Sequence, residues 1–239
     1  SVPGMLFDPG APLHIPPAYL LKAFPWLARF VAAARPERVR AISAALATLH
    51  AGAIEHHLAL AAEVGAPELV LRAGHLHLYR DAAAREADAA SWDLRRRHGV
   101  AFETLEGAGT SAPGRRVGPA YTAGVFLADH ATCTNPYRYV TRIVSAFVER
   151  GGRLVRDRLT ALVPGADGRW TCVGASGARP ASQVVLAAGA WSLELLRTVG
   201  LDAPLETQRG YHANFEVGRS PVSRTVGLTD RKAFMAPIE

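Results

Sequence analysis

The stretch that decides the fold is Gln183-Val184-Val185-Leu186-Ala187-Ala188-Gly189-Ala190-Trp191-Ser192. Residues 183–188 form an almost continuous apolar run, which predicts a strand buried on both faces. A helix is expected directly after it, over 191–199, where Gly200 would end it. Small residues at Ala188 and Gly189 allow the backbone to approach a flat ligand, because no long side chain intervenes. An ordinary strand-to-helix turn has the same spacing, so the pattern is compatible with both interpretations.

The segments around this stretch alternate between helical and extended patterns. Apolar residues three and four positions apart predict a long helix over 36–64. Further helices are predicted over 17–24, 25–34, 81–98 and 136–150. Strands are predicted over 69–79, 100–105, 121–128, 170–173, 211–217 and 232–237, with one or two more within 154–163. This order of elements predicts an α+β (mixed α/β) fold, with a mixed, largely antiparallel sheet flanked by helices.

The composition excludes several classes of protein. Of 239 residues, 49% are hydrophobic and 20% are charged, which rules out a disordered chain. No run of about 18 apolar residues occurs, so no membrane span is expected. Cys133 and Cys172 are too few for a disulfide framework and fit a reducing compartment. The net charge of +6 comes from dispersed arginines, apart from Arg95–Arg97 at a predicted helix end, so no nucleic-acid site is expected.

The remaining short motifs predict neither a nucleotide fingerprint nor a metal site. The string from Gly107 to Ala112 matches the glycine-x-glycine-x-x-glycine or alanine pattern, but no helical period follows it, so a surface loop is expected. Five histidines fall into two groups: His50, His56, His57, His75 and His77. Neither group brings the further ligands that zinc requires, so structural roles and no metal are expected.

The segment 184–192 resembles the second flavin-contact motif of the D-amino-acid oxidase superfamily of FAD-dependent oxidoreductases. Other blocks similar to that family are Pro12–Ile15, Pro25–Leu27, Gly74–Leu76, Asn135-Pro136, Arg150–Gly152, Gln208–His212 and Lys232–Pro237. They are spread through nearly the whole chain, and their order and spacing together carry the resemblance. Within the family, Gln208–His212 is most similar to the small subunit of bacterial D-amino acid dehydrogenase.

The resemblance implies a division into three parts. Residues 1–132 would form a substrate-binding lobe with a helical first part, 133–200 part of a Rossmann-like FAD-binding domain, and 201–239 a return to the substrate-binding sheet. Family members begin with a glycine-rich fingerprint and finish with a second glycine-rich segment near the flavin, and neither occurs in this sequence. We therefore expect an internal piece of a longer enzyme, in which apolar patches left by the absent segments would promote self-association.

The resemblance also implies an activity, the oxidative deamination of a D-amino acid or related amine by hydride transfer to FAD. A substrate carboxylate favours an arginine fork with a phenol or imidazole donor, which points to Arg209, Tyr211 and His212. Alternatively, Arg209 pairs with Glu206 and Tyr211 packs in the core. No residue is assigned a catalytic role. Either oxygen or a quinone would serve as the electron acceptor.

For the cofactor, the family pattern places a backbone contact to adenine near Leu159. Ala188, Gly189 and Trp191 would lie against the ribose and diphosphate. Without the fingerprint helix, this chain alone is expected to bind FAD weakly or not at all. The competing interpretation is a non-catalytic module for substrate binding or subunit contact, without flavin. A cytoplasmic location is expected, and peripheral contact with the inner face of the bacterial membrane is compatible with the basic charge.

Overall fold

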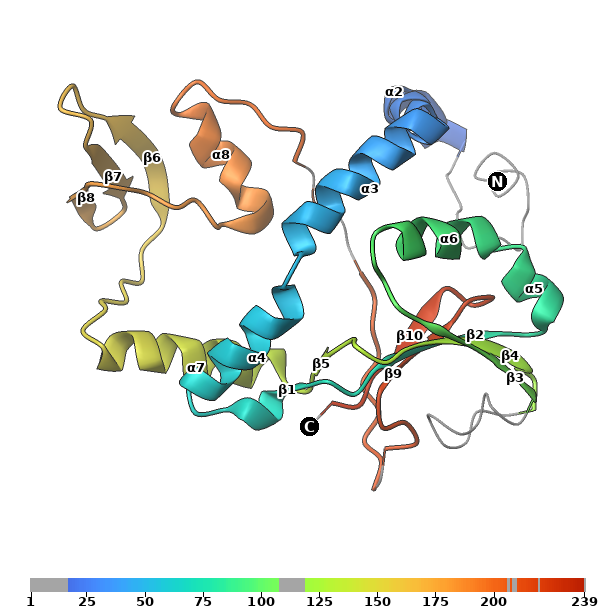
Figure 1. The fold of residues 1–239 in the computed structure, drawn as a ribbon. Coiled ribbons are helices and arrows are strands. Elements are labelled where there is room, and N and C mark those ends of the chain that lie inside the picture. Colours follow the sequence, from blue (N-terminus) through green and yellow to red (C-terminus); the bar gives the residue numbers. More distant parts are fainter. Residues whose placement is uncertain (1–16, 108–118, 206, 208–209, 219, 239) are drawn as a thin grey trace. The chain divides into compact units, whose positions relative to one another are not determined.

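The computed structural model describes residues 17–107, 119–205, 207, 210–218 and 220–238 (Figure 1). The chain divides into two compact units: Ser1–Tyr139 together with Ser220–Glu239, and Val140–Arg219. These boundaries differ from the predicted ones at 132/133 and 200/201. The assignment of substrate and cofactor roles to the parts of the chain stays a prediction.

A five-stranded sheet forms the centre of the first unit, with the order β10-β9-β2-β4-β3. Its strands are β2 His75–Tyr79, β3 Glu103–Glu106, β4 Ala123–Leu127, β9 Thr225–Leu228 and β10 Ala233–Met235. β2 pairs antiparallel with β4 and parallel with β9, and the outer pairs are antiparallel. The sheet is therefore mixed and largely antiparallel, which confirms the predicted fold class.

The alternation of side chains along β2 decides which residues enter which layer. Leu76 and Leu78 are fully buried on one face, where Val222 and Val226 pack against them. On the other face Tyr79 joins a core cluster that includes Trp92. Two short helices lie on that side of the sheet (Figure 1): α5 Ala82–Glu86 and α6 Ala89–Arg97.

The helix predicted over 81–98 is correct at its start and wrong in its middle. Asp81 caps α5 as expected, because its Oδ1 accepts a hydrogen bond from the Ala84 backbone N–H at 2.8 Å. The helix then breaks at Ala87 and Asp88 before α6 begins. The break leaves the Asp88 carboxylate free to accept a hydrogen bond from the Tyr79 hydroxyl at 2.9 Å.

Two predictions about the first helices are wrong. The structure has α2 Pro17–Ala33, α3 Pro36–His50 and α4 Ala53–Glu63. Pro25 was expected to open a second helix, but α2 continues through it, at the cost of one backbone hydrogen bond. The long helix predicted over 36–64 is interrupted at Gly52, whose φ of 71° lies in the left-handed region that glycine adopts readily.

A short ribbon joins the first helices to the sheet. A single turn, η1 Pro67–Leu69, leads into β1 Val70–Leu71, which pairs antiparallel with β5 Thr132–Cys133. Residues 72–74 then separate β1 from β2, so the strand predicted over 69–79 is two strands. The helix predicted over 136–150 is confirmed as α7 Pro136–Glu149, and it crosses the boundary between the two units.

The second unit contains an antiparallel sheet of three strands and a helix. The strands are β6 Leu159–Pro164, β7 Trp170–Gly174 and β8 Gly177–Ala181. The pairing of 170–173 with the strand before it is confirmed. A turn, η3 Gly189–Trp191, precedes α8 Ser192–Arg197. Thr198 joins α8 to the sheet, because its Oγ1 donates to the Leu195 carbonyl at 2.7 Å and accepts from the Leu162 backbone N–H at 3.0 Å.

The predicted strands over 183–188 and 211–217 are wrong. Both segments lack strand structure, and Val185 is 90% exposed. A strand needs a neighbour to satisfy its backbone N–H and C=O groups, and none of the described strands pairs with either segment. The apolar pattern of 183–188 therefore predicted a buried position that the described part of the chain does not provide.

Asp157 supports the turn between β7 and β8. Its side chain is 7% exposed and accepts hydrogen bonds from Ser176 Oγ at 2.5 Å and Arg179 Nη1 at 2.6 Å. These two contacts, the first above all, hold the pKa of Asp157 well below its usual range. A carboxylate with a depressed pKa stabilises the fold at neutral pH, and this contribution is lost as the pH falls below its ordinary value.

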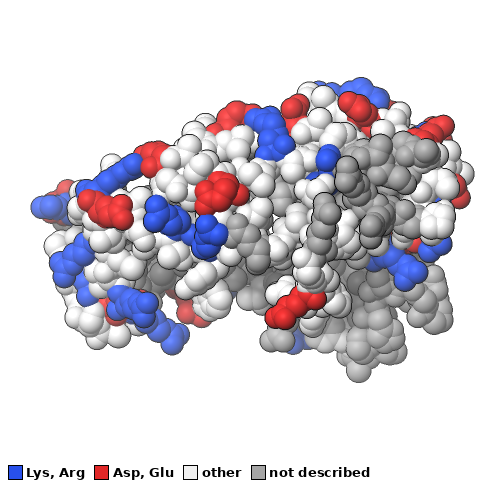
Figure 2. Space-filling view, turned by 90° about the horizontal axis from the view of Figure 1, so that it is seen from below, with Lys and Arg blue, Asp and Glu red and all other residues white. Residues whose placement is uncertain are grey.

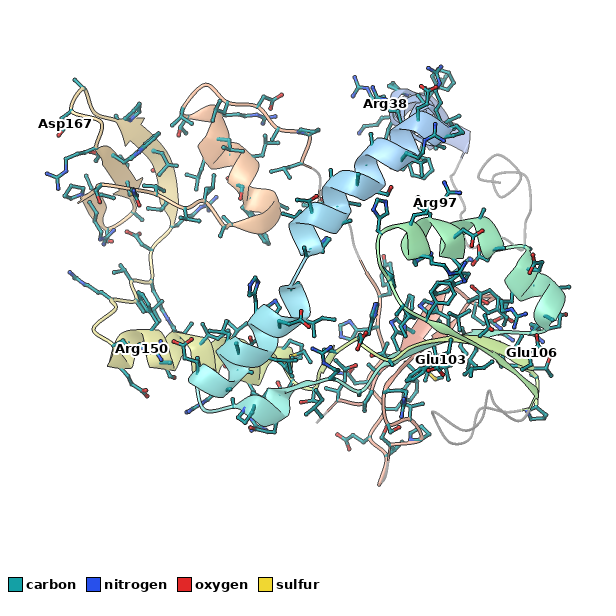
Figure 3. The ribbon with its side chains drawn as sticks, viewed as in Figure 1. Arg38, Arg97, Glu103, Glu106, Arg150 and Asp167 are labelled. Atoms are coloured by element: carbon teal, nitrogen blue, oxygen red, sulfur yellow. The ribbon has the colours of Figure 1, made fainter. Side chains whose placement is uncertain are left out.

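We expect Asp157→Asn to lower the thermal unfolding midpoint by several degrees at pH 7, because the amide cannot replace the charge-assisted bonds to Ser176 and Arg179. Asp167→Asn is the matched control, since Asp167 is an exposed acid in the turn between β6 and β7 (Figure 3). Circular dichroism melts of both variants at pH 7 and pH 3 test the expectation. Equal midpoints for the two variants at pH 7 would contradict it.

Candidate functional site: an aromatic pocket in the first unit

A pocket of about 210 Å³ opens beside the five-stranded sheet. One wall comes from β2 and the α5–α6 region, with the residues His77, Tyr79, Asp88, Trp92 and Arg95. The other wall comes from the hairpin of β9 and β10, with the residues Gly227, Leu228, Thr229, Lys232 and Phe234. We call this the aromatic pocket. Figure 3 shows how densely side chains gather between α6 and the sheet.

The local sequence explains why these side chains meet. His77 and Tyr79 share one face of β2, because strand side chains alternate. Trp92 and Arg95 are three residues apart and therefore share one side of α6. In the parallel pair of β2 and β9, His77 lies opposite Gly227, so the hairpin is in register with the aromatic side chains of β2.

The β9–β10 turn is held against the rest of the sheet by Asp230. Its carboxylate accepts hydrogen bonds from Arg80 Nε and from the Tyr121 hydroxyl, both at 2.8 Å. Thr229 adds a bond from its Oγ1 to the Leu78 carbonyl at 2.8 Å. Lys232 closes the turn with a φ of 51°, a left-handed conformation that is uncommon for a residue other than glycine. These contacts fix the position from which Lys232 and Phe234 reach the pocket.

A chain of hydrogen bonds runs through the base of the pocket. Trp92 Nε1 donates to the Tyr79 hydroxyl at 2.8 Å, and that hydroxyl donates to Asp88 Oδ2 at 2.9 Å. Burial raises the pKa of Tyr79 to about 12, so the phenol keeps its proton at neutral pH. Tyr79 therefore acts as a hydrogen-bond donor that occupies Asp88, and not as a base.

Two cations face the pocket without an acidic partner in the described part of the chain. Arg95 lies over the Trp92 ring, 4.7 Å from its centroid, and donates through Nη1 to Ser91 Oγ at 2.6 Å and to the Ser91 carbonyl at 3.1 Å. No ion pair forms between a described acid and either Arg95 or Lys232. Because Asp88 is the one acid of the pocket lining and already accepts from Tyr79, the pocket has a positive balance. It therefore favours an anionic group.

His77 brings a neutral ring to the same wall. Its ring stacks on His75 at 4.4 Å between centroids and meets Trp92 edge-on at 5.1 Å. Burial, followed by the nearby His75 and Arg95, lowers the pKa of His77 to about 4. Burial also lowers the pKa values of His75 and His130, whose rings are 5.9 Å apart. At neutral pH this group of histidines is therefore uncharged.

The predicted substrate residues lie elsewhere in the chain. Arg209, Glu206 and the string 108–112 fall outside the described residues. Tyr211 is 92% exposed and His212 is exposed, and both belong to the second unit. The alternative that Tyr211 packs in the core is therefore wrong. A role for Arg209, Tyr211 and His212 in substrate binding stays a prediction.

The predicted cofactor residues lie in the second unit. Leu159 is half-buried at the start of β6, and Ala188 is half-buried just before η3. Gly189 has a φ of 56°, and a Cβ added there would meet nothing within 4 Å. Trp191 is 71% exposed beside it. Among the described residues, no bulky side chain fills the space at Gly189, so the backbone of this turn is open to close approach.

One wall of the aromatic pocket can be recognised from the order of residues in the sequence. The pattern His75-Leu76-His77-Leu78-Tyr79 alternates polar rings with leucines, and Trp92 and Arg95 follow with helical spacing. His75 and His77 share one face of β2, as the 4.4 Å distance between their stacked rings shows. The contribution of the hairpin was not predicted, because Gly227 and Phe234 are about 150 residues further along the chain.

Charge on the molecular surface does not concentrate in one patch on the face that Figure 2 presents. Basic and acidic side chains are intermingled there, which fits dispersed arginines better than a nucleic-acid track. Among the described helices, none is both long enough and apolar enough to cross a membrane. Among the described residues, no group of three or more potential metal ligands comes together.

A family model described as FAD dependent oxidoreductase (DAO) matches residues 14–237. The chain therefore belongs to the DAO family of FAD-dependent oxidoreductases. It is 34% identical over 233 residues to a D-amino-acid oxidase of Bradyrhizobium diazoefficiens, and the alignment covers 97% of this chain and 55% of that protein. It is also 30% identical over 229 residues to a D-amino acid dehydrogenase of Dechloromonas aromatica, and that alignment covers 86% of this chain and 51% of the dehydrogenase.

The chain spans about half the length of these relatives. Among solved structures, L-proline dehydrogenase from P. horikoshii aligns with a TM-score of 0.58 and 13% identity over 77% of this chain and 51% of that one. At that identity the likeness shows a shared fold alone. The family predicted from the sequence motifs is confirmed.

Proposed function

We propose that this chain serves the FAD-dependent oxidative deamination of an amino acid, most specifically a D-amino acid, and that the aromatic pocket receives the substrate. The observation that supports this most directly is the pair of cations, Arg95 and Lys232, on an aromatic-walled pocket in a chain of this family. An amino acid carries a carboxylate that such cations would hold and a side chain that aromatic rings would cover. The oxidase and dehydrogenase relatives are both named for D-amino acids.

The residues of the pocket would bind and orient the substrate. Arg95 and Lys232 would attract its carboxylate, while Trp92 and Phe234 would exclude water from its side chain. Tyr79 would keep Asp88 occupied, so that this acid does not compete for the two cations. A second set of substrate contacts is proposed for Arg209, Tyr211 and His212. Their guanidinium, phenol and imidazole groups can each donate a hydrogen bond to a carboxylate.

The residues proposed for the cofactor fit a nucleotide. Gly189 offers open backbone, Ala188 is small, and Trp191 presents an exposed ring, while Leu159 would offer a backbone contact to adenine. FAD bound there would supply the acceptor for the two electrons released when the amine becomes an imine, which water then converts to a keto acid and ammonium. The protein would contribute orientation and electrostatics.

The complete product of the gene tests this proposal. We expect it to retain flavin absorbance after dialysis and to reduce an artificial electron acceptor with a D-amino acid, with the corresponding L-amino acid at least about 100-fold less active. With a two-electron acceptor, ammonium release should match acceptor reduction one to one. Retained flavin with turnover of L-amino acids instead would reject the D-specific part, and absence of turnover with every amino acid would reject the function.

A non-catalytic role is the second candidate, as a module for substrate binding or subunit contact. It is favoured by the apolar segment 184–186, in which Val185 is 90% exposed and the backbone pairs with none of the described strands. Under this role the chain would bind an amino acid or a protein partner and show no dye-linked oxidation. The flavin and turnover measurements above separate the two candidates.

A further inference from the structure

We infer that the aromatic pocket selects substrates that combine a carboxylate with an aromatic or equally bulky apolar side chain, and that Gly227 sets this size limit. The inference rests on the proposed function and narrows it to a substrate class. It assigns the recognition of charge to Arg95 and Lys232, and the recognition of size to Gly227 and Phe234.

The volume of the pocket decides against small substrates. Its 210 Å³ is more than ten times the space that one water molecule needs, about 10–15 Å³. A substrate with a hydrogen atom or a methyl group as its side chain would leave space for several waters beside Phe234. A larger apolar side chain would displace those waters and bury the aromatic faces.

The walls present their rings in an arrangement that suits a further ring. His77 meets Trp92 at an interplanar angle of 77° and Phe234 at 88°. The His77–Phe234 centroids are 6.2 Å apart. Edge-to-face contacts of this kind are favourable because the positive edge of one ring meets the negative face of another. The rings of His77, Trp92 and Phe234 therefore make a corner that an aromatic side chain can extend.

The charged end of the pocket is complementary to a carboxylate. Among the described residues, the Arg95 guanidinium donates only to the hydroxyl and the carbonyl of Ser91, which are neutral acceptors. Its guanidinium still carries donors that can bind a carboxylate. Lys232 adds a second positive charge from the opposite wall. His77 is neutral, so it adds to the apolar wall rather than to the charge.

Gly227 controls the position of the Phe234 ring. A Cβ on residue 227 would lie 2.8 Å from Phe234 Cε1, 3.1 Å from Phe234 Cδ1 and 3.3 Å from His77 Nδ1. The ring lies over the glycine because no side chain occupies that space. Its side chain is largely exposed, so the ring can move when a methyl group is added. Gly227→Ala would therefore displace the wall without straining the backbone, since residue 227 is not in the left-handed region.

Binding of a non-oxidisable probe tests the inference without redox chemistry. The probe is 3-phenylpropanoate, which carries the carboxylate and the ring but no amine. Isothermal titration calorimetry on the complete gene product should give an affinity at least about 100-fold higher than for acetate, which lacks the ring. It should also be about 10-fold or more higher than for 3-phenylpropanamide, which lacks the charge.

Matched variants assign the two parts of the site. Gly227→Ala should weaken 3-phenylpropanoate about 10-fold, by the displacement of Phe234. Gly218→Ala is its control, because a Cβ there would meet no described atom within 4 Å and residue 218 is not in the left-handed region, so it should leave the affinity unchanged. Arg95→Gln should weaken binding about 10-fold or more, whereas Arg97→Gln, an exposed residue of the same helix (Figure 3), should not.

The outcomes separate this inference from the proposed function. Equal affinities for acetate and 3-phenylpropanoate, or an affinity that Gly227→Ala and Gly218→Ala change alike, would overturn the inference even where amino acids are oxidised. Probe binding with the expected variant pattern would support it even where no turnover is found. If Gly227→Ala fails to fold, Phe234→Leu should produce the same selective loss for the aromatic probe.

Discussion

Replacing Trp92 by alanine should lower the free energy of unfolding by about 3–5 kcal/mol, which is a large part of the stability of an ordinary domain. Trp92 is 5% exposed and belongs to the core cluster with Tyr79, Ala123, Val125 and Leu127. Alanine would leave a cavity between α6 and the sheet, and would also remove the Nε1 donor to the Tyr79 hydroxyl. Urea unfolding followed by circular dichroism measures the change.

Two further variants decide what the loss means. Trp26→Ala is the matched control, because Trp26 is an exposed tryptophan of α2 and should change the free energy of unfolding by less than about 1 kcal/mol. Trp92→Phe keeps an aromatic ring but not the donor, and should cost less than Trp92→Ala. If Trp92→Ala and Trp26→Ala unfold at the same urea concentration, α6 does not pack on the sheet as described.

Acidification from pH 6.5 to pH 4 should lower the free energy of unfolding by about 1–2 kcal/mol through His77 alone. Its pKa is about 4 in the folded protein, below the value of 6.5 for an unperturbed ring. Between these values the unfolded chain binds a proton that the folded chain does not, so stability is complete above pH 6.5 and falls toward pH 4. The full shift would correspond to about 3 kcal/mol, and the partial exposure of the ring reduces it.

The surroundings of His77 offer protonation little compensation. His75 and Arg95 oppose a positive charge there, and His130 does so more weakly, while Asp88 favours it but is bonded to Tyr79. We expect His77→Gln to flatten the pH dependence of unfolding between pH 4 and pH 6.5. His50→Gln, at an exposed position of α3, should leave the dependence as it is in the parent protein. Parallel profiles for the parent and His77→Gln would refute this origin.

The sequence predicted those features of the fold that depend on neighbouring residues. The helix predicted over 136–150, the cap at Asp81 and the pairing of β6 with β7 follow from local patterns, and the structure confirms them. The family also followed from short motifs, since several of them occur in the expected order. Patterns of neighbouring residues were therefore enough to predict these helices and strands and the protein family.

The features that the sequence did not predict depend on distant partners. Residues 183–188 have the composition of a buried strand, yet in the described chain no neighbouring strand exists to pair with them. The aromatic pocket needs His77 and Gly227 side by side, which only the parallel pairing of β2 with β9 provides. Periodicity records neither kind of contact, because it contains no information about which strands become neighbours.

The parallel pairing of β2 with β9 also has a consequence for how the protein is made. The two strands are separated by about 150 residues, and the whole second unit lies between them in the chain. At a synthesis rate of roughly 5–20 residues per second, β2 leaves the ribosome about 8–30 s before its partner. During that interval one edge of β2 has no hydrogen-bonding neighbour, which leaves it open to pairing with other chains until β9 arrives.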